Sequence, residues 1–164
     1  MKIRLLWVGK TRNVHLKGLI EDYWTRLGHF CELSLREVQP VKSEAAKGRL
    51  ATLEGEKLLA RVDASDYLVL LDSTGKSLTT EKFAAWLCKH RDQSTRNLVF
   101  VIGGHEGLSA AVKQRADFVI SLSALTSLLL LNYVAKRLGE LVGKGLPWQV
   151  VAEFLVLSVP FTVA

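Results

Sequence analysis

The hydrophobic positions of this chain follow two kinds of pattern that take turns along it. Residues 2–8 and 31–38 have the alternating character of β-strands, whereas residues 16–27 repeat with the period of an amphipathic helix. The apolar stripe of that helix consists of Leu16, Leu19, Ile20, Tyr23 and Leu27. The start of the chain is therefore predicted to form a β-α-β unit.

Two later strands are expected to be buried more deeply. Residues 67–71 and 98–102 are apolar on both faces, which is typical of strands covered on both sides in a parallel sheet. Ser73–Lys76 combines a glycine with small polar residues, so we expect it to turn the chain after the first of these strands.

Helices are expected between the strands, and a further strand over residues 118–122. The predicted helices span residues 16–27, about 44–62, Ser77 or Thr79 to about His90, 109–116 and the leucine-rich 127–142. This alternation predicts an α/β fold with a mainly parallel sheet flanked by helices. Since no linker or repeat divides the sequence, residues 1–164 are expected to form one domain.

The charged residues are unevenly distributed along the chain, but their distribution does not identify a function. The net charge is +6, and residues 1–61 carry twelve basic and seven acidic side chains, whereas residues 62–126 carry seven of each. The basic surface should therefore lie mostly on the first third of the chain. Such a bias suits phosphate-rich partners, although many basic domains bind no nucleic acid, so charge alone leaves both possibilities open.

The cysteines, the tryptophans and the termini argue for a packed cytoplasmic protein. The two cysteines lack the spacing of a metal or redox site, and no histidine or carboxylate cluster suggests a metal. No signal-peptide pattern begins the chain, and apolar residues 154–164 are too few to span a membrane. The side chains expected in the core are Cys31, Cys88, Trp7, Trp24 and Trp86, while Trp148 is free to be functional.

Three segments that follow predicted strands could together hold a ligand. They are Leu71–Asp72, Gly103–Gly107 and Leu122–Ser127. Because ligands in open α/β sheets bind at the carboxyl ends of the strands, we expect one crevice there. The glycines allow either close approach of a ligand or only a tight turn, and dinucleotide and triphosphate fingerprints are absent. No sequence feature singles out His105 or a serine as a catalytic residue.

At these strand ends the sequence resembles the RlmH family of SPOUT-class methyltransferases, over residues 1–126. The motifs that carry the resemblance are Met1-Lys2-Ile3, Val8-Gly9-Lys10, Glu21-x-Tyr23-x-x-Arg26-Leu27, Glu54-Gly55-Glu56, Leu71-Asp72-x-x-Gly75-Lys76, Phe100-Val101-Ile102-Gly103-Gly104-x-x-Gly107-Leu108 and Ser121-Leu122-Ser123-x-x-Thr126. The resemblance implies methylation of N3 of a pseudouridine in 23S ribosomal RNA, with S-adenosylmethionine as cofactor.

The resemblance also implies where the cofactor binds and how the chain assembles. By position, the cofactor contacts fall on Leu71, Gly103, Leu122, Ser123, Ala124, Leu125, Thr126 and Ser127. A C-terminal trefoil knot is implied, which is a rare exception to the rule against threaded chains. A homodimer with its active sites at the subunit interface is implied as well.

Beyond Thr126 the sequence departs from the family pattern. A histidine, an arginine and a Glu-Gln-x-Tyr-Arg-Ala motif are expected there, whereas residues 127–131 read Ser-Leu-Leu-Leu-Leu. The tail is divergent, shortened by a deletion or altered by a frameshift, and no catalytic residue is assigned. Two alternatives to an active methyltransferase follow: an impaired homologue that keeps the fold, dimer or cofactor pocket, and a nucleotide-binding α/β module.

Overall fold

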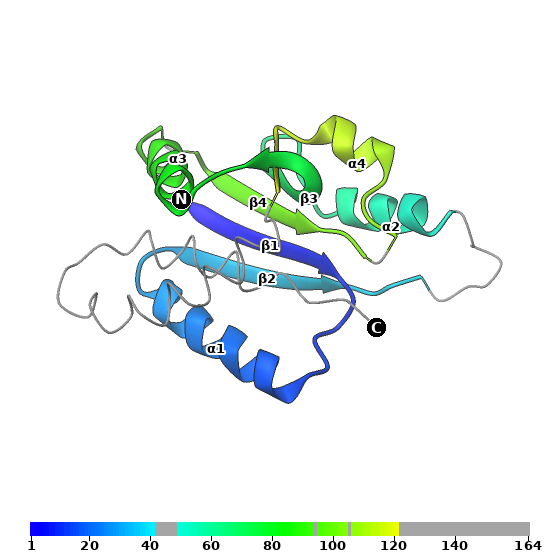
Figure 1. Cartoon of the computed structure of the whole chain (residues 1–164), viewed down its shortest axis with the longest axis horizontal. Coiled ribbons are helices and arrows are strands. Elements are labelled where there is room, and N and C mark those ends of the chain that lie inside the picture. The colour runs from blue at the N-terminus through cyan, green and yellow to red at the C-terminus, as the bar shows by residue number, and fades with distance from the viewer. Residues whose placement is uncertain (42–48, 94, 105, 122–164) are drawn as a thin grey trace.

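The computed structural model describes residues 1–41, 49–93, 95–104 and 106–121 (Figure 1). Strands and helices alternate throughout these residues. Their bounds are β1 (Lys2–Val8), α1 (Val14–Gly28), β2 (Glu32–Val38), α2 (Leu50–Leu59), β3 (Tyr67–Ser77), α3 (Thr80–Asp92), β4 (Asn97–Ile102), α4 (Ala110–Arg115) and β5 (Phe118–Ser121). The predictions for residues 42–48, His105 and residues 122–164 lie outside the described residues.

The described strands form one sheet with the order β2-β1-β4-β3-β5, in which all neighbours run parallel. The predicted α/β class with a parallel sheet is confirmed. Trp7 of β1 pairs with Ile102 of β4, and Leu71 of β3 pairs with that same Ile102. The carboxyl ends of β1 and β4 therefore meet at one edge of the sheet (Figure 1), and Leu71 of β3 lies beside the end of β4.

Helices cover both faces of this sheet, as the apolar strands predict. One cluster of buried side chains joins the sheet to α1 and α3, and the other joins it to α2 and α4. β4 supplies both: Phe100 belongs to the first cluster, and Val99 and Val101 belong to the second. Trp7 is buried, and the half-buried members of the first cluster include Trp24, Trp86, Cys31 and Cys88, so their predicted core positions are confirmed.

Side chains at the helix starts fix where the helices begin. Asn13 Oδ1 accepts hydrogen bonds from the first turn of α1, and Thr79 Oγ1 accepts one from Lys82 N. Thr79 is thus the cap of α3, and Ser77, the alternative, is the last residue of β3. Among the described residues, no helix is long and apolar enough to cross a membrane.

The turn predicted at Ser73–Lys76 is wrong, because β3 continues through these residues. Its pairing with β5 shifts between Leu71 and Lys76, so the intervening residues form a bulge. Asp72 Oδ1 accepts hydrogen bonds from both the backbone N–H and the hydroxyl of Thr74. Gly75 lies against the backbone of β5, where a Cβ atom would stand 2.6 Å from the carbonyl carbon of Ile120.

The amino-terminal edge of the sheet is closed by the buried carboxylate of Asp66. This carboxylate accepts hydrogen bonds from Arg4, from Asn97 Nδ2 at 2.7 Å and from Asp63 N at 2.8 Å. Arg115 adds a hydrogen bond from Nη2 to the backbone carbonyl of Asp66, at 3.0 Å. The side chains of β1 and β4 are thus tied to the start of β3.

The contacts of Gly75 predict a position-specific cost for adding a methyl group. Gly75→Ala should lower the free energy of unfolding by about 1–3 kcal/mol, because the backbone of Ile120 has to move. Gly18→Ala is the matched control, since nothing lies within 4 Å of a Cβ atom at that helical position. It should raise stability by about 0.5–1 kcal/mol. Urea unfolding measures both, and equal effects would contradict the close approach of β3 to β5.

Candidate functional site

The described structure brings two of the three predicted ligand-binding segments together. β3 lies between β4 and β5, and Leu71 pairs with Ile102 on one side and with Ile120 on the other. Gly103 directly follows β4, so it stands next to the half-buried Leu71 at the carboxyl edge of the sheet. β5 ends at Ser121, and the third segment, residues 122–127, lies outside the described residues. Ligand contact by any of these residues stays a prediction.

Gly103, Gly104 and Gly107 pack closely together after β4, and we call these three residues the glycine turn. Gly107 N donates a hydrogen bond of 2.9 Å to Gly104 O, and these two residues form an isolated antiparallel bridge. The φ angle of Gly107 is +77°, in the left-handed region that favours glycine. A Cβ atom on Gly103 would stand 2.7 Å from Gly107 O. Packing within the chain therefore accounts for Gly103, as the tight-turn interpretation requires.

Two neighbouring residues of α2 support both ends of this turn. A Cβ atom on Gly104 would stand 2.6 Å from Glu54 Oε2, and one on Gly55 would stand 2.2 Å from Ser109 Oγ. Ser109 is buried and caps α4, with its Oγ accepting from Val112 N at 3.4 Å. The start and the end of the segment between β4 and α4 thus rest on α2.

The sequence singles out Glu54 only as part of the motif Glu54-Gly55-Glu56. Its side chain is buried, and Oε1 accepts a hydrogen bond of 3.2 Å from Val41 N. Oε2 is also buried and has no hydrogen-bond partner among the residues that the structure describes. The signal for its burial was present in the sequence, because Glu54 precedes the buried Leu58 by one helical turn and so shares its face.

Asp72 links the end of β3 to α4. Lys113 Nζ lies 2.8 Å from Asp72 Oδ2, and the Thr74 hydroxyl donates to Oδ1 at 2.6 Å. The hydrogen bond from Lys113 and that from Thr74 lower the pKa of Asp72 to about 2. The carboxylate is therefore ionised at neutral pH, and its charge is already balanced by Lys113.

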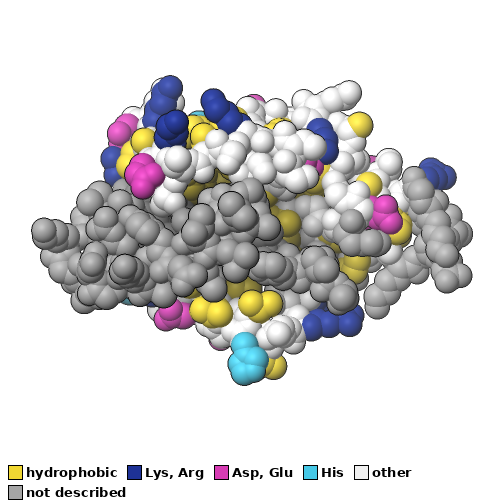
Figure 2. Space-filling model, in the orientation of Figure 1, with side chains coloured by type: hydrophobic (Ala, Val, Ile, Leu, Met, Phe, Trp, Pro, Cys, Tyr) yellow, Lys and Arg dark blue, Asp and Glu magenta, His cyan; other side chains and the backbone are white. Residues whose placement is uncertain are grey.

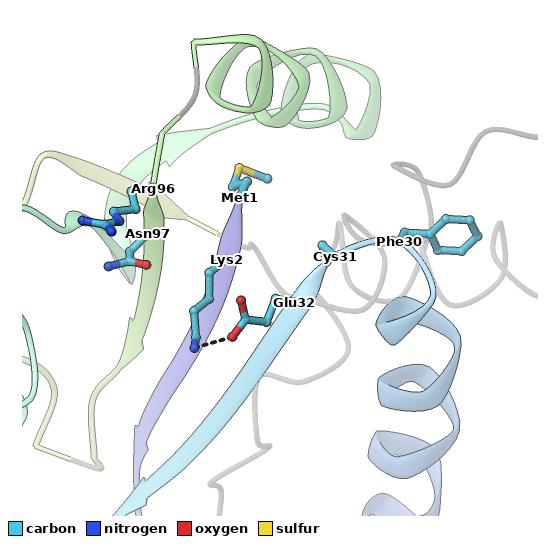
Figure 3. Close-up of a pocket in the computed structure, with 7 residues that line it drawn as sticks. All are labelled: Met1, Lys2, Phe30, Cys31, Glu32, Arg96 and Asn97. Atoms are coloured by element: carbon cyan, nitrogen blue, oxygen red, sulfur yellow. Dashed lines mark hydrogen bonds and ion pairs between the residues drawn. The ribbon is translucent and has the colours of Figure 1, made fainter.

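A groove of about 500 Å³ lies at the opposite edge of the sheet (Figure 3). It is lined by Met1, Lys2, Phe30, Cys31, Glu32, Arg96 and Asn97. Lys2 and Glu32 form an ion pair of 2.5 Å across it, and the Phe30 ring lies away from this pair. Of the predicted site residues that the structure describes, neither Leu71 nor Gly103 lines this groove. In the described part of the chain, no group of three His, Cys, Asp or Glu side chains is placed to hold a metal ion.

Known proteins are similar to most of this chain. The family model described as predicted SPOUT methyltransferase matches residues 1–131. Ribosomal RNA large subunit methyltransferase H of Trichlorobacter lovleyi is 40% identical over 127 residues, covering 77% of this chain and 82% of that protein. The protein of the same name from Lactococcus lactis is 40% identical over 131 residues, with the same coverage. That from Geotalea daltonii is 36% identical over 126 residues, also covering 77% and 82%.

The glycine turn predicts different costs at its first two positions. Gly103→Ala should lower the free energy of unfolding by about 1–3 kcal/mol, because the methyl group meets the backbone of Gly107. Gly104→Ala should cost less, because its one contact under 3 Å is with the end of the flexible Glu54 side chain. In a Glu54→Asp background the cost at Gly104 should shrink further, whereas the cost at Gly103 should not change. Urea unfolding of the two double-mutant cycles measures this, and equal coupling at both positions would contradict it.

Proposed function

This chain belongs to the SPOUT methyltransferase family, and from that premise we propose that it methylates N3 of a pseudouridine in 23S ribosomal RNA with S-adenosylmethionine as donor. The observation that carries the proposal is the strand order, which brings Leu71 and Gly103 together at the carboxyl edge of a parallel sheet. The relatives named as large subunit ribosomal RNA methyltransferases support the substrate class. A ribosomal substrate implies that the protein acts in the cytoplasm.

The described part of the site fits such a donor. Leu71 offers a half-buried apolar side chain, and Gly103 and Gly104 offer half-buried backbone at the same edge of the sheet. Glu54 Oε2, buried beside Gly104, has no hydrogen-bond partner among the described residues and so leaves an acceptor at this position. When bound, S-adenosylmethionine would supply an activated methyl group. The proposed contacts are Leu71, Gly103, Leu122, Ser123, Ala124, Leu125, Thr126 and Ser127.

The acceptor side of the reaction sets a second requirement. Methylation at N3 needs the proton of that nitrogen removed and its lone pair held in line with the methyl group. The family match ends at residue 131, so residues 132–164 lie beyond it. We therefore infer that donor binding is intact and that turnover is slow, with the catalytic residue unassigned.

A methylation assay with a grafted tail tests this proposal. The full chain should bind S-adenosylmethionine in calorimetry but transfer its methyl group only slowly to large ribosomal subunits that lack the modification. Replacing residues 127–164 with the C-terminal segment of the Lactococcus lactis relative should raise the rate. If neither the chain nor the graft methylates the subunits, the proposed function is wrong. Binding of a nucleotide in place of S-adenosylmethionine would favour the nucleotide-binding module.

The assembly proposed with this function is a homodimer of a single knotted domain over residues 1–164. Residues 127–142 and 154–163 carry more apolar side chains than are needed to cover one edge of the sheet. A partner subunit would bury the remaining apolar surface. Light scattering at micromolar concentration should give about twice the chain mass of 18.2 kDa. A stable particle of 18.2 kDa would contradict the dimer.

A further inference from the structure

We propose that the loop of residues 9–13, here the β1–α1 loop, binds RNA phosphates beside the methyl-transfer site through Lys10 and Arg12. This inference rests on the proposed function, which supplies RNA as the partner. It adds the surface that holds the RNA, which is separate from the residues proposed to contact the methyl donor.

The β1–α1 loop lies at the carboxyl edge of the sheet. β1 is hydrogen-bonded to β4, so the carboxyl ends of both strands lie at the same edge (Figure 1). Val8, the last residue of β1, stands 3.4 Å from the position of a Cβ atom on Gly104 in the glycine turn. Because consecutive Cα atoms are about 3.8 Å apart, the Cα atom of Lys10 lies within about 8 Å of that of Val8. The loop therefore borders the glycine turn.

Hydrogen bonds fix the backbone of the β1–α1 loop. Gly9 adopts a φ angle of +101° and donates a hydrogen bond of 2.9 Å to Val38 O. Thr11 N donates to Glu37 Oε1 at 3.2 Å. Asn13 closes the loop by capping α1, accepting from His15 N at 2.9 Å. A loop held at its beginning, middle and end loses little conformational freedom when a ligand binds.

The two positive charges of the β1–α1 loop are not neutralised by described side chains. The side chains of Lys10 and Arg12 are exposed and make no hydrogen bond or ion pair with the described residues. At the opposite edge Lys2 pairs with Glu32, Arg4 with Asp66 and Arg115 with Asp117. Lys89 and Arg96 at that edge are exposed as the loop cations are, so they serve below as the comparison for charge alone. Basic side chains stand at the lower right of Figure 2, where Figure 1 places the β1–α1 loop.

The side chains of Lys10 and Arg12 suit the phosphates of RNA. Lysine and arginine bind phosphates by displacing condensed counterions, and the arginine fork fits a phosphate with two parallel hydrogen bonds. The neighbouring carboxylate of Glu37 weakens the local positive charge but is engaged with the loop backbone. Two cations on a fixed loop can thus hold phosphates near the target base.

The experiment compares two double variants of the full chain that remove the same charge. Lys10→Gln/Arg12→Gln changes the β1–α1 loop, whereas Lys89→Gln/Arg96→Gln removes two exposed cations at the amino-terminal edge. Binding to large ribosomal subunits and to a fluorescein-labelled single-stranded RNA is measured over a range of salt concentrations. S-adenosylmethionine binding, measured by calorimetry, checks that each variant is folded.

The loop variant should lose about fivefold in RNA affinity for each phosphate contact at 0.1 M salt, and its salt dependence should flatten by about 0.7 per contact. The control variant should bind RNA with nearly the affinity of the unchanged protein, and both should bind the methyl donor normally. Equal losses in both variants, or binding of the unchanged protein to anionic vesicles but not to RNA, would overturn the surface. A loop-specific loss of RNA binding in a chain that does not methylate would support the surface while the proposed function fails.

Discussion

The parallel pairing of β4 between β1 and β3 is the constraint on which the rest of the described structure depends. Five consecutive residues of β4, Leu98–Ile102, are buried, and they contribute to both hydrophobic clusters. Because parallel neighbours all point the same way, burying this strand also brings the carboxyl ends of β1 and β4 to one edge, beside Leu71 of β3. The β1–α1 loop, the glycine turn and Leu71 become neighbours only as a consequence of this pairing.

The two edges of the sheet are built from different contacts. At the amino-terminal edge the carboxylate of Asp66 accepts hydrogen bonds from Arg4, Asn97 and a backbone N–H group, which ties β1 and β4 to the start of β3. At the carboxyl edge the backbone packs closely at glycines, and the buried Glu54 Oε2 has no hydrogen-bond partner among the described residues. Side-chain hydrogen bonds thus fix the first edge, and close backbone packing fixes the second.

The sequence predicted what depends on local pattern and missed what depends on distant partners. The buried strands and the Thr79 cap were predictable because apolar runs and capping side chains act within a few residues. The bulge at Ser73–Lys76 was not, because a turn and a bulge use the same glycine and polar residues, and only pairing with β5 distinguishes them. In the same way, the motif containing Glu54 did not show that its carboxylate lies under Gly104, which is fifty residues further on.

The donor and acceptor halves of the proposed reaction rest on different parts of the chain. The described part of the donor half depends on the strand order, on glycine contacts and on α2, all within the residues that match the family. The acceptor half needs groups that orient one nitrogen and take its proton, and tight donor binding does not replace them. A chain can therefore keep the fold and the donor site while its rate changes greatly. The glycine turn, which touches β1 on one side and α2 on the other, is the place where the proposed donor site and the proposed RNA-binding loop meet.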